Sequence, residues 1–246
     1  MPTDEGLRVA GVTVRFGEVI AVDGAGLEAP PGTVTGLIGP GGAGKTTFFD
    51  VITGLLRPAE GTVHLDGADL GSSTPRERAR HGMARTSQRA SGSLTVRENV
   101  LVAARKHAVA QERGWRDRRD ARRGAGDVAD SLLERVGIGS YAGCRADSLP
   151  VGVARLMELA RALATEPRLL LLDEPWAGLP VPEARSLECL LRDLAAGGLA
   201  VLLVEHDLEL VMGVCDVLYV LDEGKVISHG PPVQVRSDPR VRQAYR

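Results

Sequence analysis

Hydrophobic and polar residues alternate along the first part of the chain in a way that is typical of β-strands. The alternation covers residues 7–16 and 19–28, and a period of two indicates strands with one buried face. Residues 33–38 form a continuous apolar strand, and the apolar positions of residues 46–56 repeat with the period of a helix. The chain is therefore predicted to start with β structure that leads into a strand–loop–helix unit.

The pattern changes further along the chain. Residues 89–165 have helical periodicity, whereas over 166–246 continuous apolar strands alternate with helices. Such strands indicate a parallel sheet that is covered on both faces. We therefore predict an α/β fold in one composite domain over 1–246. Residues 1–88 and 166–246 would form the core with a β subdomain, and 89–165 a helical subdomain.

Composition narrows the class of protein. Of the 246 residues, 43% are hydrophobic, and 30 Lys and Arg nearly balance 32 Asp and Glu, for a formal charge of −2. A dedicated nucleic-acid binder would be basic overall, so we expect no nucleic-acid partner. No apolar run approaches the ~18 residues of a membrane helix, and residues 1–5 lack the build of a signal peptide. We therefore expect a cytoplasmic chain.

A glycine-rich segment after the apolar strand matches the Walker A pattern G-x-x-x-x-G-K-[ST]. In this pattern backbone N–H groups wrap a phosphate chain, and the positive end of the following helix points at it. We expect Lys45 to reach the β- and γ-phosphates and the Thr46 hydroxyl to hold Mg²⁺; the alternative is a chance glycine-rich turn. The residues predicted to bind ATP here are Gly39, Pro40, Gly41, Gly42, Ala43, Gly44, Lys45, Thr46 and Thr47.

Two carboxylates follow the apolar run at residues 169–172. Asp173 stands where a Walker B aspartate holds Mg²⁺. Glu174 beside it suits a general base that polarises the water attacking the γ-phosphate. The alternative is that Asp173 only caps a turn before Pro175.

With these motifs in order, the sequence resembles the ATP-binding subunits of ABC transporters. The resemblance implies a P-loop (RecA-like) core with a parallel sheet, an N-terminal antiparallel β subdomain and an inserted helical subdomain. Residues 85–88 resemble the family's Q-loop and residues 204–207 its H-loop, and Phe16 lies where an aromatic ring stacks on adenine. The catalytic residues implied in this way are Lys45, Gln88, Glu174 and His206. The implied Mg²⁺ ligands are Thr46, Gln88 and Asp173.

One branch of the family accounts for most of the resemblance, the ATPases of branched-chain amino-acid uptake systems with Arg-Thr-x-Gln at the Q-loop. Four segments carry it: 39–47, 161–175, 204–213 and 239–245. It implies a subunit that hydrolyses ATP to energise uptake of branched-chain or other hydrophobic amino acids. The implied partners are a second ATPase subunit, transmembrane permease subunits and, indirectly, a substrate-binding protein. The chain would then be peripheral on the inner face of the cell membrane.

The sequence departs from the family in two motifs. The signature Leu-Ser-x-Gly-Gln is replaced by Leu-Pro-Val-Gly-Val at 149–153, and the D-loop at 176–180 carries Trp176 and Pro180 in place of its usual residues. In this family two nucleotide-binding domains sandwich ATP head to tail, and each presents these motifs to the other. Both departures lie in motifs that are presented to the partner, whereas the motifs that act on this chain's own nucleotide are intact. This asymmetry predicts a different ATPase partner with an intact signature, and reduced hydrolysis by this chain alone.

Two other functions remain open on the sequence. One is a non-hydrolysing ABC nucleotide switch with a degenerate signature, against which the presence of Glu174 and His206 speaks. The other is a soluble ABC ATPase outside transport, which would usually carry a long coiled-coil insertion or two linked nucleotide domains. The basic stretch 105–123 could touch acidic lipid headgroups, but the sequence favours a solvated helical insertion.

Overall fold

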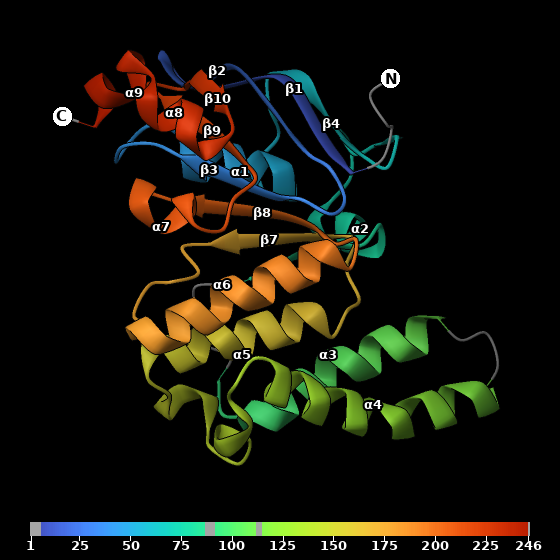
Figure 1. Ribbon diagram of the computed structural model, residues 1–246. Helices are drawn as coiled ribbons and strands as arrows, with labels where there is room; N and C mark the ends of the chain where they lie inside the picture. The colour runs from blue at the N-terminus through green and yellow to red at the C-terminus, as the bar shows by residue number, and fades with distance from the viewer. Residues whose placement is uncertain (1–5, 87–91, 112–114, 246) are drawn as a thin grey trace. The chain divides into compact units, whose positions relative to one another are not determined.

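A computed structural model describes residues 6–86, 92–111 and 115–245 (Figure 1). The chain folds as two compact units. The first contains residues 1–83, 168–174 and 191–246, and the second contains residues 84–167 and 175–190. The helical stretch of the sequence thus falls in the second unit, while both sets of predicted strands fall in the first. The assignment of all 246 residues to one domain stays a prediction.

An antiparallel sheet of four strands opens the first unit, as the alternating pattern predicts. Its order is β2-β1-β4-β5, and β1 pairs antiparallel with both β2 and β4. Alternate residues of β1 such as Leu7 and Val9 are buried, because a period of two directs them to one face. The strands are β1 Leu7–Phe16, β2 Val19–Ala29, β4 Glu60–Leu65 and β5 Ala68–Asp69.

The second sheet has the order β10-β9-β3-β8-β7-β6. β3 pairs parallel with β8 and β9, and β8 pairs parallel with β7. All of β3 and β8 is buried, which is why these strands read as continuous apolar runs. The predicted α/β fold with a parallel sheet is confirmed. The strands are β3 Val34–Ile38, β6 Met83–Arg85, β7 Leu169–Asp173, β8 Ala200–Glu205, β9 Val217–Asp222 and β10 Lys225–Gly230.

The helix after β3 is shorter than its apolar period predicts. α1 spans Lys45–Thr53 and ends at Gly54, whose φ of 76° is left-handed and whose N–H donates back to the carbonyl of Val51. Phe48 and Phe49 of α1 are fully buried in the core. The other helices of this unit are α2 Pro75–Arg80, α7 Leu208–Met212, α8 Pro232–Ser237 and α9 Pro239–Ala244. α6, Val181–Ala196, begins in the second unit and ends in the first.

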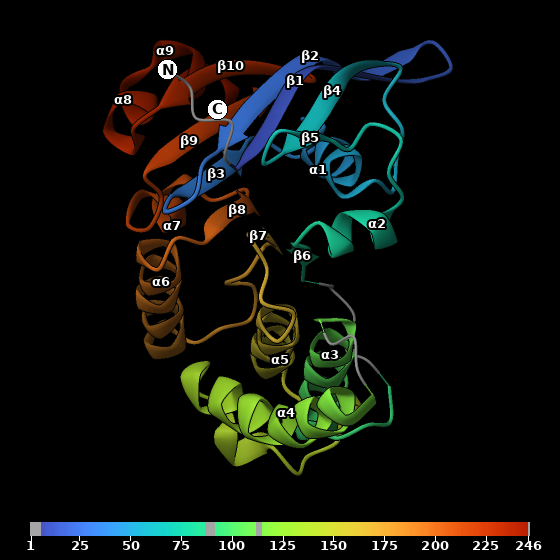
Figure 2. The same cartoon turned by 90° about the vertical axis from the view of Figure 1, so that its right-hand side faces the viewer.

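The second unit is helical. α3 packs against α4 and α5, as both views show (Figures 1 and 2). Arg97 of α3 binds Asp130 of α4 through two hydrogen bonds of 2.6 and 2.8 Å. No helix in the described ranges is long and apolar enough to cross a membrane. The elements are α3 Val96–Gln111, α4 Trp115–Arg135, α5 Val151–Leu163 and the short 3₁₀ turns η1 Gly139–Tyr141 and η2 Ala146–Ser148.

One side chain joins the two sheets of the first unit. The hydroxyl of Tyr219 in β9 accepts a hydrogen bond of 3.2 Å from the N–H of Glu28 in β2, and burial raises the pKa of this phenol. We expect Tyr219→Phe to lower the free energy of unfolding by about 0.5–1.5 kcal/mol, the contribution of one hydrogen bond. The loss should be no larger, because phenylalanine keeps the ring that stacks on His229. Urea unfolding measures the change, with Tyr141→Phe in the second unit as the control. An unchanged midpoint would show that the bond contributes nothing.

Candidate functional site

The predicted phosphate loop lies between the end of β3 and the start of α1. Gly44 begins the helix with φ 99°, and a Cβ there would lie 2.4 Å from the carbonyl oxygen of Ala21. A Cβ on Gly39 would lie 2.0 Å from the carbonyl oxygen of Leu221. Both positions therefore require glycine. Since Gly44 offers no side chain to cap α1, the first N–H groups of the helix are left for an anion.

Lys45 is held at the loop by backbone oxygens. Its Nζ donates hydrogen bonds of 2.6 Å to the carbonyl of Gly39 and 2.8 Å to that of Pro40. Burial lowers the pKa of the Lys45 ammonium, while the negative charges of Glu174 and Glu205 act in the opposite direction. A cation that is partly removed from water next to helix N–H groups is suited to binding phosphate.

The two predicted carboxylates end the neighbouring strand. Asp173 is the last residue of β7, and Glu174 follows it with a left-handed φ of 46°. The N–H of Glu174 donates a 3.0 Å hydrogen bond to the carbonyl of Val204 in β8, which fixes this unfavourable backbone. A non-glycine residue in this region costs on the order of 1 kcal/mol or more, and such strain clusters at functional sites.

His206 lies directly after β8 and faces Glu174. Its Nδ1 is 3.5 Å from Oε1 of Glu174, and its side chain is 64% exposed. Lys45, Glu174 and His206 thus come from three segments that are distant in sequence and meet in the first unit. A carboxylate, a cation and an imidazole in this arrangement are suited to hydrolysis of a phosphoanhydride.

The described residues contain no group of three or more His, Cys, Asp or Glu that could enclose a metal ion. Mg²⁺ is usually held by one or two protein oxygens, with phosphate and water completing its octahedron. The exposed Thr46 and the partly buried Asp173 fit such a site. Bound there, Mg²⁺ would neutralise charge on the phosphates.

Two predicted site residues remain, Gln88 and Phe16. Gln88 lies outside the described residues. Phe16 ends β1 and is 54% exposed, which leaves its ring free to stack on a planar base. Its strand pairs with β2, and the carbonyl of Ala21 in β2 lies against the phosphate loop.

Sequence reasoning missed Glu205 as a site residue. It is the last residue of β8, and its side chain is only 2% exposed although it is acidic. Its Oε2 is 3.6 Å from Nδ1 of His206. The signal was present in the sequence: five apolar residues, 200–204, run into a single acidic one.

The degenerate signature and D-loop pack on one another inside the second unit. Pro150 is the N-cap of α5 and provides no side-chain hydrogen bond to the helix. A Cβ on Gly152 would lie 2.7 Å from the carbonyl oxygen of Gly178, so the two loops touch backbone to backbone. Val151 and Val181 beside this contact are 63% and 67% exposed. The signature, through Val151, and the first residue of α6 after the D-loop, Val181, therefore present apolar side chains to solvent.

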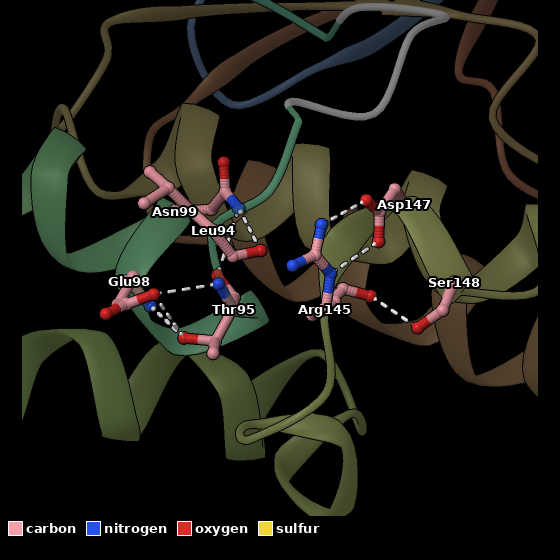
Figure 3. Close-up of polar contacts among 7 residues, drawn as sticks. All are labelled: Leu94, Thr95, Glu98, Asn99, Arg145, Asp147 and Ser148. Carbon is pink, nitrogen blue, oxygen red and sulfur yellow. Dashed lines mark hydrogen bonds and ion pairs between the residues drawn. The ribbon is translucent and has the colours of Figure 1, made fainter.

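The segment that leads into the signature lies beside the residues that start α3, and Figure 3 shows the polar contacts within each of the two segments. Thr95 pairs with Arg145 as a β-bridge, and the N–H of Ala146 donates a 2.9 Å hydrogen bond to the carbonyl of Leu94. Thr95 and Glu98 form a capping box at the start of α3. These bonds hold the entry to α3 and the approach to the signature in one arrangement.

The chain is similar to known proteins over nearly its whole length. Residues 22–177 match the family model of the ABC transporter, and residues 225–245 match that of the branched-chain amino acid ATP-binding cassette transporter. Two relatives are high-affinity branched-chain amino acid transport ATP-binding proteins, BraF of Pseudomonas aeruginosa and LivG of Escherichia coli. Each is 38% identical over 97% of this chain and 96% of the relative. The crystal structure of a nucleotide-free ATP-binding cassette from an ABC transporter matches with a TM-score of 0.84 at 31% identity, over 98% of this chain and 99% of that one.

Proposed function

This chain belongs to the ABC transporter family of ATP-binding proteins, and on that premise we propose that it hydrolyses ATP to energise amino-acid uptake. The substrates would be branched-chain or other hydrophobic amino acids, as the names of BraF and LivG and the match at residues 225–245 suggest. One observation supports this proposal most: Lys45, Glu174 and His206 lie close together beside the phosphate loop.

Each predicted residue has a proposed role. The loop at 39–47 and Lys45 bind the phosphates, and Thr46, Asp173 and Gln88 hold Mg²⁺. Glu174 accepts a proton from the attacking water, and its carboxylate already lies beside an imidazole that can contact the γ-phosphate. Phe16 stacks on adenine, for which its exposed ring is suited.

Transport requires partners, and we propose a complex at the inner face of the cell membrane. The chain would bind transmembrane permease subunits, with a substrate-binding protein acting indirectly, and a second, different ATPase subunit. Pro150 and Val153 lack the hydroxyl and amide that the family signature offers to the partner's nucleotide. Since a hydrogen bond to a charged group contributes ~1.5–3 kcal/mol, loss of one would weaken that site roughly 10- to 150-fold. A partner with an intact signature would keep the site on this chain competent.

Restoring the signature tests the asymmetric pairing. We expect Pro150→Ser with Val153→Gln to raise the ATPase rate of this chain on its own at least about tenfold, because the hydroxyl and amide return. The matched control is Val181→Gln, which places the same amide on a neighbouring exposed valine outside the signature. Steady-state phosphate release measures the rate. A wild-type chain that alone reaches the rate of its full complex would contradict the asymmetry.

Uptake tests the proposed substrate. In cells that lack this chain, we expect uptake of radiolabelled leucine to fall and the wild-type chain to restore it. The variant Lys45→Ala, which lacks the ammonium proposed to bind the phosphates, should not restore leucine uptake. Unchanged leucine uptake in the deletion strain would exclude this substrate class, whereas restoration by Lys45→Ala would exclude ATP as the energy source.

A further inference from the structure

Glu205 occupies an unusual place for a carboxylate. It closes the buried strand β8 and lies in register with Ile38, the residue that precedes the phosphate loop. Its side chain is 2% exposed. Burying a charge is costly unless other groups compensate for the lost water, so its neighbours should be groups that a carboxylate stabilises.

Those neighbours belong to the candidate site. Oε2 of Glu205 accepts a hydrogen bond of 3.2 Å from the backbone N–H of His206 and lies 3.6 Å from Nδ1 of the same residue. Oε1 of Glu174, the residue that follows β7, lies 3.5 Å from that Nδ1. One nitrogen of the imidazole therefore faces two carboxylates. Because carboxylates accept and do not donate, they favour a proton on Nδ1.

We propose that Glu205 is a positioning residue, which holds His206 with its Nδ1–H toward Glu174 and leaves Nε2 for a group outside the protein. The role rests on the proposed hydrolysis of ATP. Glu205 does not touch the reacting atoms and acts through His206, and its charge also favours the ammonium of Lys45. A group that orients a functional histidine in this way commonly changes activity 10- to 100-fold on removal.

The test compares Glu205→Gln with wild type in the full transporter complex. The amide keeps an oxygen for the His206 N–H but removes the charge, so we expect kcat to fall about tenfold while KM for ATP stays within about twofold. The matched control is Glu209→Gln, an exposed glutamate paired with Arg236 at 3.0 Å, which should change neither constant. If Glu205→Gln does not fold because its amide is buried, Glu205→Met is measured in its place as a second variant without the charge.

A second measurement detects directly which nitrogen of the His206 imidazole carries the proton. Nitrogen NMR at about pH 8, above the usual histidine pKa of ~6.5, distinguishes a proton on Nδ1 from one on Nε2. The His206 signals are identified by their loss in His206→Gln. We expect a proton on Nδ1 in wild type and a shift toward Nε2 in Glu205→Gln, with no change in Glu209→Gln.

The outcomes separate this role from the proposed function. A wild-type complex that does not hydrolyse ATP overturns the function, while the NMR signals still test the position of the proton. If wild type hydrolyses ATP but Glu205→Gln keeps its kcat or its Nδ1 proton, the positioning role is overturned alone. A rise in KM with unchanged kcat also overturns it, because Glu205 would then act on binding through Lys45.

Discussion

Glu174→Gln is expected to lower the rate of ATP hydrolysis by the complex about 10²–10⁴-fold, the usual contribution of a general base. Glutamine has the same shape and can keep the left-handed backbone and its bond to Val204, but its amide cannot take a proton from water. Phosphate release under saturating ATP measures turnover. Titration with a fluorescent nucleotide measures affinity separately, and we expect it to change little because the phosphate loop is untouched.

A second glutamate provides the control for this substitution. Glu166 also has a left-handed backbone, with φ 45°, and its exposed carboxylate lies 3.5 Å from His107 in the second unit. Glu166→Gln repeats the same change beside another histidine, one that belongs to the second unit, and should leave turnover unaltered. If Glu174→Gln keeps the measurable turnover of wild type, the proton is taken by another base. If neither protein releases phosphate, the result supports the non-hydrolysing switch.

The parts of the site that the sequence predicted are those that local geometry determines. The loop at 39–47 depends on glycines at fixed spacing, and at two of them, Gly39 and Gly44, a Cβ would strike a carbonyl oxygen. Asp173 and Glu174 follow from the rule that parallel strands end at one edge of a sheet. Their neighbour His206 directly follows the end of the adjacent strand β8, by the same rule.

Contacts between distant segments were beyond prediction. The contact of Gly152 with Gly178 joins the signature to the D-loop, and most of α5 and all of β7 separate the two glycines in the sequence. Neither motif contains a pattern that predicts this contact. The two short strands β5 and β6 were also missed, because two or three residues carry no period. Likewise Gly54, which ends α1, was read as part of the helix because the apolar pattern continues past it.

Arg78 is the residue whose sequence context is most misleading. Its helix, α2, reads Pro-Arg-Glu-Arg-Ala-Arg, a pattern typical of a solvated surface, yet Arg78 is 2% exposed. Its Nη1 donates hydrogen bonds of 2.7 and 2.6 Å to the carbonyls of Val51 and Ile52 in the last turn of α1. Nη2 and Nε donate to the carbonyls of Leu70 and Ser73 at 2.7 and 3.2 Å. The guanidinium thus satisfies the open end of the helix that starts at the phosphate loop.

We expect Arg78→Met to lower the free energy of unfolding by about 3–5 kcal/mol, because it removes a buried charged donor and its hydrogen bonds to four carbonyl oxygens. Methionine fills much of the volume, so the loss measures hydrogen bonds and charge more than packing. Urea unfolding followed by circular dichroism gives the value, and Arg76→Met, an exposed residue of the same helix, is the control. Stability equal to wild type would mean that water replaces the guanidinium. Since α1 begins at Lys45 and ends at these carbonyls, a large loss would also weaken nucleotide binding at its far end, which Arg76→Met should leave intact.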